Sequence, residues 1–142
     1  NFSAKEYSEA GSLDAYLLIF TQRIDSADDP LWESNSLARL ESDFNTAMIN
    51  CREVFGNMAF RVTQKSGRRT PINRALFEAQ ALAFADHDPH KVRRCKDELR
   101  EKFADLLADD EFSASVRSGT GALRNVEIRL NRARALVTEV IR

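Results

Sequence analysis

The chain has 142 residues, of which 43% are hydrophobic and 30% are charged, and its formal net charge is −1. This length and composition are typical of one folded domain and exclude a disordered tail or a disulfide-stabilised miniprotein. No apolar run reaches the roughly 18 residues of a membrane span, and no signal-type apolar segment follows a basic start. We therefore expect a single cytoplasmic domain over residues 1–142 with no membrane partner. Because the chain begins at Asn1 rather than Met, we also expect a fragment of a longer protein.

The first two predicted helices follow from apolar residues that recur every three or four positions. One helix is expected over 12–25, with Ser12 as its N-cap. A second is expected over 36–55, and Gly56 is expected to end it in a left-handed conformation. Each helix has an apolar stripe, so each should bury one face.

A capping residue followed by proline predicts where the next two helices begin. Thr70 and Pro71 are expected to open a helix over 71–85, and "DHDPH" repeats the pattern for a helix over 89–108. Apolar residues cover nearly the whole circumference of 71–85, which predicts that this helix is central and that Phe77 is buried.

The last third of the chain adds a short turn of helix in "DDEFSASVR" and a long final helix. In the final helix, the apolar residues from Leu123 to Val140 alternate spacings of three and four. The sequence as a whole predicts an all-α fold, a single bundle of five to six helices with short loops.

Charge is distributed unevenly along the chain. Residues 1–60 contain 4 Lys and Arg against 10 Asp and Glu, whereas residues 61–142 contain 17 against 12. This asymmetry is compatible with a basic face for nucleic acid and an acidic face for a partner, and equally with ion pairs between the two halves.

Few side chains suggest a metal site. His87 and His90 straddle the start of a helix, so their side chains need not converge, and Asp88 with Pro89 is interpreted as a cap. Cys51 and Cys95 each lie within an apolar stripe, which predicts thiols packed in the interior rather than a disulfide or a metal pair. We expect no metal and no cofactor.

Two further segments are interpreted as structural. The "SGTG" at 118–121 has the small residues of a phosphate-binding loop, but it lacks a lysine and a preceding strand, so a connector between helices is favoured. The carboxylates and cations of 98–102 are interpreted as a solvated helix face. With no triad-like set of Ser, His and Asp, we expect no catalytic residues in this segment.

The stretch "AFRVTQKSGRRTPINRALFEA", residues 59–79, combines five cations with a flexible glycine between two apolar runs. Basic clusters commonly bind phosphates. The candidate nucleic-acid-binding residues are therefore Arg61, Lys65, Arg68, Arg69 and Arg74. The alternative is a solvated loop that only turns the chain, with Arg74 paired to Glu78 at i, i+4. Arg61 is further expected to fix the hinge through hydrogen bonds to carbonyls or a carboxylate.

The order of the motifs along the chain carries a family resemblance. "YSEAGSLDAYLLIF", "REVFGNMAFR", "RRTPINRALFEA", "FADLLADDEFSASVRSGTG" and "VEIRLNRA" follow one another from Tyr7 to about Val140. The series resembles the C-terminal helical region of the GmrSD-type restriction family, whose subunit S region has a ParB-like fold. The most specific words are Phe-Gly-x-x-Ala-Phe-Arg at 55–61 and Pro-Ile-Asn-x-Ala-Leu-Phe-Glu at 71–78.

The resemblance implies a part of a larger protein. Nucleotide-dependent nuclease chemistry in this family is associated with an N-terminal ParB-like domain carrying an Asp-Gly-Gln-Gln-Arg motif, and often with a C-terminal His-Asn-His nuclease domain. Neither motif occurs in this chain. The parent protein therefore resembles a nucleotide-dependent DNA endonuclease of bacterial phage defence, and this segment resembles its non-catalytic helical module.

The expected partners are the missing N-terminal domain of the same protein and DNA, while the oligomeric state stays open. An independent helical adaptor, docking on a protein through its final helix, is the alternative function. A small metal-dependent enzyme using His87 and His90 is a third, less favoured hypothesis.

Overall fold

The computed structural model describes residues 4–25, 36–62 and 70–142, whose regular secondary structure is entirely helical, with no strand among these residues. The all-α prediction is confirmed. The described residues form eight α-helices and one 3₁₀ helix, more than the five to six expected. The chain divides into two compact units, Asn1–Ser42 and Asp43–Arg142, and each is described by itself.

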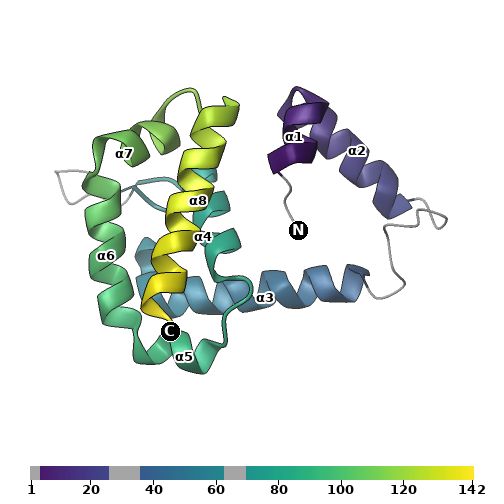
Figure 1. Ribbon diagram of the computed structural model, residues 1–142. Helices are drawn as coiled ribbons and strands as arrows, with labels where there is room; N and C mark the ends of the chain where they lie inside the picture. The colour runs from purple at the N-terminus through teal and green to yellow at the C-terminus, as the bar shows by residue number, and fades with distance from the viewer. Residues whose placement is uncertain (1–3, 26–35, 63–69) are drawn as a thin grey trace. The chain divides into compact units, whose positions relative to one another are not determined.

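Unit 1 contains a helical hairpin formed by α1 (Ala4–Ala10) and α2 (Leu13–Asp25) (Figure 1). Gly11, with φ +75°, makes the turn between them. Ser12 caps α2 as predicted, since its Oγ accepts a hydrogen bond from the Ala15 N–H at 3.2 Å. Helix α1 was not expected from the sequence because seven residues are too few to show a clear apolar period.

Helix α3 (Ser36–Phe55) begins in unit 1, continues into unit 2 and has the predicted bounds. Gly56 ends it with φ +55°, a left-handed conformation that favours glycine, as the sequence predicted. The 3₁₀ helix η1 (Gly56–Met58) follows directly.

Helix α4 (Arg74–Phe84) is the centre of unit 2, where it packs against α8 (Leu123–Val140) and α7 (Asp110–Arg117) (Figure 1). It begins three residues later than the predicted 71–85, because Asn73 rather than Thr70 is its N-cap. The Thr70 hydroxyl is engaged elsewhere, donating to the Val62 carbonyl at 2.8 Å.

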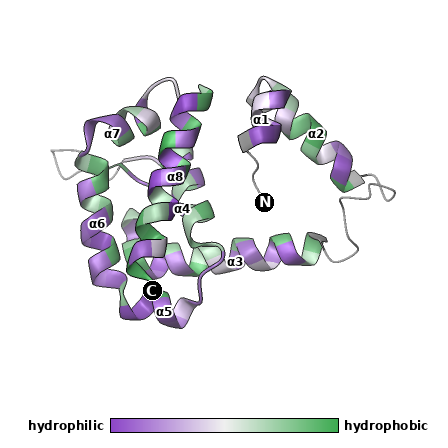
Figure 2. Ribbon diagram, in the orientation of Figure 1, coloured by the Kyte–Doolittle hydropathy of each residue, from purple (hydrophilic) through white to green (hydrophobic). Residues whose placement is uncertain are grey.

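The predicted helix over 89–108 is two helices, α5 (Pro89–Arg94) and α6 (Lys96–Ala108). Asp88 caps α5 as expected, since its Oδ1 accepts from the His90 N–H at 2.8 Å. Cys95, with φ −107° and ψ 10°, leaves the helical conformation, and its N–H bonds to the Val92 carbonyl in a tight turn. In Figure 2, hydrophilic and hydrophobic bands alternate along α6 and α8, as expected of helices with one buried face.

Aromatic rings form the centre of the core. Phe84 stacks on Phe103 with 5.8 Å between ring centroids, and Phe55 meets both rings edge-on at 5.9 and 5.1 Å. Phe77, expected in the core, is only half-buried and packs against Phe60 at 4.7 Å. The helix α4 stripe that faces the core therefore ends in Phe84 rather than passing through Phe77.

The two cysteines differ in burial. Cys51 is fully buried, and burial raises the pKa of its thiol to about 12, as expected of a packed, unreactive thiol. Cys95 is free and only partly buried at the break between α5 and α6. The prediction of an interior thiol therefore holds for Cys51 and in part for Cys95.

A charged contact fastens α7 to α8. Asp109 is the N-cap of α7, where its Oδ1 accepts from the Phe112 N–H at 2.9 Å, and the same carboxylate pairs with Arg132 of α8. The hydrogen bond from Arg132, followed by the one from Phe112, lowers the pKa of Asp109 to about 2.

Candidate nucleic-acid interface

The basic stretch begins next to Phe60, whose backbone is held by hydrogen bonds to Gln80 and Asn73. Phe60 has φ +63°, a left-handed conformation that is rare for an aromatic residue. Its N–H donates to Oε1 of the buried Gln80 at 2.8 Å, and its carbonyl accepts from the Asn73 N–H at 2.8 Å. Both backbone polar groups of Phe60 are thus satisfied by the α4 segment, which holds the strained conformation in place.

A second pair of contacts joins the two ends of the basic stretch. Thr70 donates its hydroxyl to the Val62 carbonyl, and its own carbonyl accepts from Nη1 of Arg61. The prediction that Arg61 fixes the hinge by bonding a carbonyl is confirmed. Lys65, Arg68 and Arg69 belong to 63–69, which lies outside the described residues. We call the residues Phe60–Val62 and Thr70–Asn73 the loop neck.

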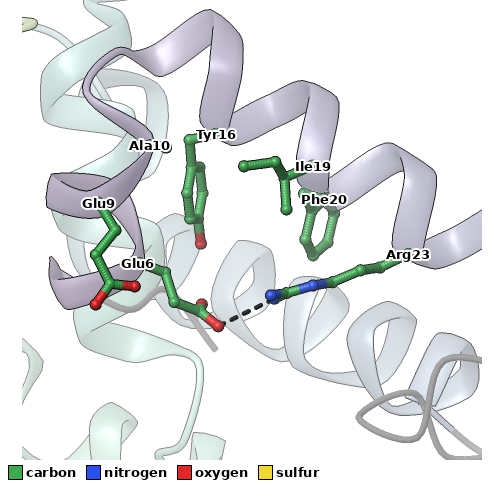
Figure 3. Close-up of a pocket in the computed structure, with 7 residues that line it drawn as sticks. All are labelled: Glu6, Glu9, Ala10, Tyr16, Ile19, Phe20 and Arg23. Atoms are coloured by element: carbon green, nitrogen blue, oxygen red, sulfur yellow. Dashed lines mark hydrogen bonds and ion pairs between the residues drawn. The ribbon is translucent and has the colours of Figure 1, made fainter.

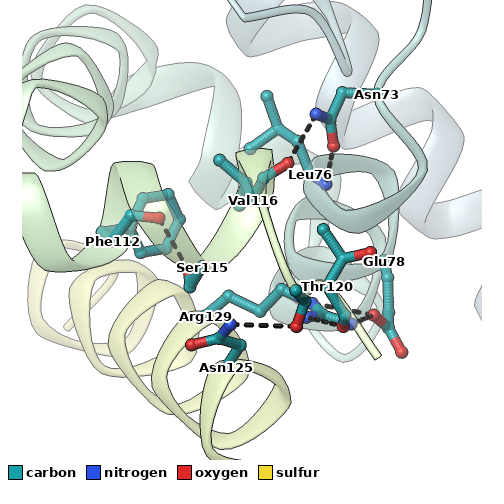
Figure 4. Close-up of polar contacts among 10 residues, drawn as sticks. Asn73, Leu76, Glu78, Phe112, Ser115, Val116, Thr120, Asn125 and Arg129 are labelled. Carbon is teal, nitrogen blue, oxygen red and sulfur yellow. Dashed lines mark hydrogen bonds and ion pairs between the residues drawn. The ribbon is translucent and has the colours of Figure 1, made fainter. Parts of the chain in front are cut away.

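Asn73 joins the loop neck to α7 (Figure 4). Its Oδ1 accepts from the Leu76 N–H at 2.8 Å as the cap of α4, and its Nδ2 donates to the Val116 carbonyl at 2.7 Å. Together with the backbone hydrogen bond to Phe60, these contacts make Asn73 the residue where three segments meet: the segment of Phe60, the start of α4 and the end of α7. We call this set, Phe60, Asn73 and Val116, the Asn73 junction.

Each segment of the Asn73 junction carries an arginine next to the bonded residue. Arg61 follows Phe60, Arg74 follows Asn73, and Arg117 follows Val116. Arg61 is half-buried in the loop neck, whereas Arg74 and Arg117 are exposed. Sequence analysis did not single out Arg117, because it lies 43 residues beyond Arg74 in the sequence and only the hydrogen bond between Asn73 and Val116 links their two segments.

Arg74 does not form the i, i+4 pair with Glu78 that the solvated-loop alternative expected. Glu78 instead binds Arg129 of α8, which reaches it through Nε at 2.9 Å and through Nη2. Arg129 also donates Nη1 to the Thr120 carbonyl at 2.7 Å (Figure 4). The side chain of Arg129 is only 5% exposed, and a buried guanidinium without a carboxylate partner is costly. Glu78 therefore pairs with Arg129 rather than with solvent-exposed Arg74.

The "SGTG" segment is a connector between α7 and α8, as predicted. Gly119 has φ +57°, and Nδ2 of Asn125 binds the Ser118 and Gly119 carbonyls at 3.1 and 2.9 Å. These contacts, with the Arg129 bond to Thr120, hold the connector against the first turns of α8.

Unit 2 has a net positive charge, whereas unit 1 has a net negative charge. Asp43–Arg142 contains 18 Lys and Arg against 14 Asp and Glu, whereas Asn1–Ser42 contains 3 against 8. Several cations of unit 2 are paired on its surface, among them Arg93 and Lys96, which both contact Glu53. Those two cations lower the pKa of Glu53, the Lys96 hydrogen bond being the larger cause.

The other sequence candidates do not assemble into a site. His87 is half-buried, and burial lowers its pKa, while His90 is exposed. Within residues 4–25, 36–62 and 70–142, no three His, Cys, Asp or Glu residues gather in a group that could hold a metal. In 98–102, Lys102 contacts Glu139 of α8 at 3.8 Å and Arg100 donates its Nε to the Val54 carbonyl at 2.8 Å, so only Glu98 and Glu101 match the predicted solvated face.

Unit 1 contains a small pocket between α1 and α2. It has a volume of about 150 Å³, and Glu6 on one side forms an ion pair with Arg23 on the other at 3.0 Å (Figure 3). Tyr16 and Phe20 also line it. Small-molecule sites usually measure at least about 300 Å³, so this pocket offers no room for a typical substrate.

Comparison with known proteins gives no relative: no family model, no curated protein and no solved structure matches this chain. Among the helices of the described residues, none combines the length and the apolar character that crossing a bilayer would require.

Proposed function

We propose that this chain is the non-catalytic helical module of a GmrSD-type restriction protein and that its basic stretch contacts the DNA backbone. In this proposal the module packs on an N-terminal ParB-like domain, and the complete protein acts in bacterial defence against foreign or modified DNA. The family assignment rests on the ordered motifs of the sequence.

The single observation that carries the DNA contact is the construction of the loop neck. Arg61 and Thr70 close the stretch, and Phe60 is held by bonds to Gln80 and Asn73. A chain that only reverses direction needs no more than a short turn. It would not need a buried glutamine to hold the backbone of Phe60. Anchoring a cationic segment at both ends reduces the entropy that it would lose on binding a phosphate backbone.

Salt-dependent DNA binding tests the proposal. Fluorescence anisotropy of a labelled 20-base-pair duplex should show binding that weakens steeply with salt, because cations that contact phosphates release counterions. Arg68→Ala combined with Arg69→Ala should lower the slope of log affinity against log salt by roughly two, with little effect on stability. An unchanged slope in this double variant would refute the DNA contact.

The family assignment has a separate test in the upstream reading frame. An Asp-Gly-Gln-Gln-Arg string encoded there supports the proposed parent protein. A complete gene without that string contradicts the assignment, whatever the DNA-binding result.

The alternative function, a helical adaptor, keeps one observation in its favour. The final helix is not the docking surface, because its apolar residues Val126, Ala133 and Val137 are buried within unit 2. Apolar side chains are instead exposed on the part of α3 that belongs to unit 2, namely Phe44 and Ile49. Docking of a partner on these side chains would be insensitive to salt, which distinguishes it from DNA binding.

A further inference from the structure

We infer that Arg74 and Arg117 form a second phosphate-contacting site, built by two helices and not including residues 63–69, and that this site binds the backbone of double-stranded DNA. The inference rests on the proposed function and extends it to residues that the sequence does not place together.

Each arginine directly follows one of two residues that are hydrogen-bonded to each other. Arg74 is the first residue of α4 and Arg117 is the last residue of α7. The 2.7 Å bond from Asn73 Nδ2 to the Val116 carbonyl joins the residues immediately before them, and α4 packs against α7 around that bond. The spacing between the two backbones is therefore set by helical structure rather than by a loop.

The guanidinium groups of Arg74 and Arg117 form no ion pair with a carboxylate of the described residues. The Arg74 side chain makes no hydrogen bond within the described part of the chain, and the Arg117 side chain uses only its Nε, which donates to the Ser113 hydroxyl at 2.9 Å. Two arginines of α8 differ in this respect, since Arg124 and Arg132 both pair with Glu111. The first turn of α4 contains no acidic residue that would repel a phosphate.

The chemistry of two adjacent arginines favours phosphate diesters. A guanidinium presents planar, paired donors that match phosphate oxygens, and it keeps its charge throughout the accessible pH range. Because both arginines are held on packed helices, the pair suits a regular polyanion more than a flexible one. We therefore assign it to a DNA duplex, with the arginines positioning the module on the backbone rather than reading sequence.

Single substitutions in the full chain test the site. Arg117→Ala and, separately, Arg74→Ala should each lower the salt slope of duplex binding by about one. Between 50 and 200 mM salt, the loss of affinity should then be about fourfold smaller than in the wild type. Arg117→Lys keeps the charge and should retain most of the slope.

Arg134→Ala is the matched control, because Arg134 is an exposed arginine of α8 that makes no bond to Phe60, Asn73 or Val116, and its removal changes the net charge equally. Circular dichroism should show the same melting temperature for Arg117→Ala, Arg134→Ala and the wild type. If Arg117→Ala unfolds the chain, Arg117→Gln provides the same charge removal with a longer side chain.

The outcomes separate this inference from the proposed function. If the Arg68 and Arg69 double variant lowers the slope while Arg117→Ala behaves like Arg134→Ala, the two-helix site is wrong and the loop contact stands. If wild-type protein does not bind the duplex, both proposals are wrong. If a single strand of the same length binds as tightly as the duplex, the assignment to duplex DNA is overturned.

Discussion

Replacing Asn73 by alanine tests the junction on which both proposals depend. The change removes the cap of α4 and the bond to Val116, whereas the backbone bond to Phe60 stays. Loss of an N-cap costs about 1 kcal/mol, and loss of a hydrogen bond to a partly buried carbonyl costs about another 1 kcal/mol. The free energy of unfolding should fall by about 2 kcal/mol.

For a unit of this size, about 2 kcal/mol corresponds to a fall in melting temperature of roughly 8–16 °C. Thermal melts followed by circular dichroism measure this directly, and urea titration should give a lower midpoint with the same m-value. An unchanged m-value would show that Asn73→Ala weakens the native state without altering how much surface unfolding exposes.

Asn73→Ser separates the two contributions. Its hydroxyl can still cap α4 but is too short to replace the amide that reaches Val116. The serine variant should therefore lose about 1 kcal/mol, half the loss of the alanine variant. If Asn73→Ala and Asn73→Ser both melt like the wild type, the Asn73 junction contributes nothing and the geometric argument for Arg74 and Arg117 fails with it.

Three further predictions concern the core and the charged contacts. Phe84→Ala should cost about 3–5 kcal/mol in unfolding free energy, and half-buried Phe77→Ala clearly less, so equal melting temperatures would contradict the described core. Arg129→Ala should lower the free energy of unfolding by about 3 kcal/mol because it leaves the Glu78 carboxylate unpaired. The double variant with Glu78→Leu and Arg129→Met removes both charges and should recover most of this loss. Since the pKa of Asp109 is about 2 when folded and 3.8 ordinarily, its stabilising effect is complete above pH about 4 and is lost as pH falls towards 2. Melting temperatures from pH 5 to 2 should therefore fall less steeply in Asp109→Asn than in the wild type.

Much of the helical architecture could be predicted because apolar periodicity is a local property of the chain. Helix α3 was predicted with its observed bounds, since Ser36 begins an apolar stripe and Gly56 ends it. The helix start at Asp88 and Pro89 could likewise be predicted, because an N-cap side chain bonds a free backbone N–H of its own helix.

The errors occurred where a distant segment competes for a local signal. Thr70 looks like a cap for Pro71, but its hydroxyl closes the loop neck, so α4 starts at Arg74. Glu78 looks like a partner for Arg74, but Arg129 reaches it from α8. Apolar periodicity cannot reveal such competition, because it depends only on residues that are close in sequence. Which partner a side chain binds is decided by the tertiary fold.

The same reasoning explains which part of the candidate site the sequence could reveal. The cluster from Arg61 to Arg74 is visible because its charges are neighbours along the chain, whereas Arg117 becomes a neighbour only through Asn73. Asn73 is thus needed both for the start of α4 and for the placement of Arg117. A loss of DNA affinity in an Asn73 variant would therefore mix two causes. The arginine substitutions, which leave every bond of the Asn73 junction intact, provide the direct evidence for phosphate contact.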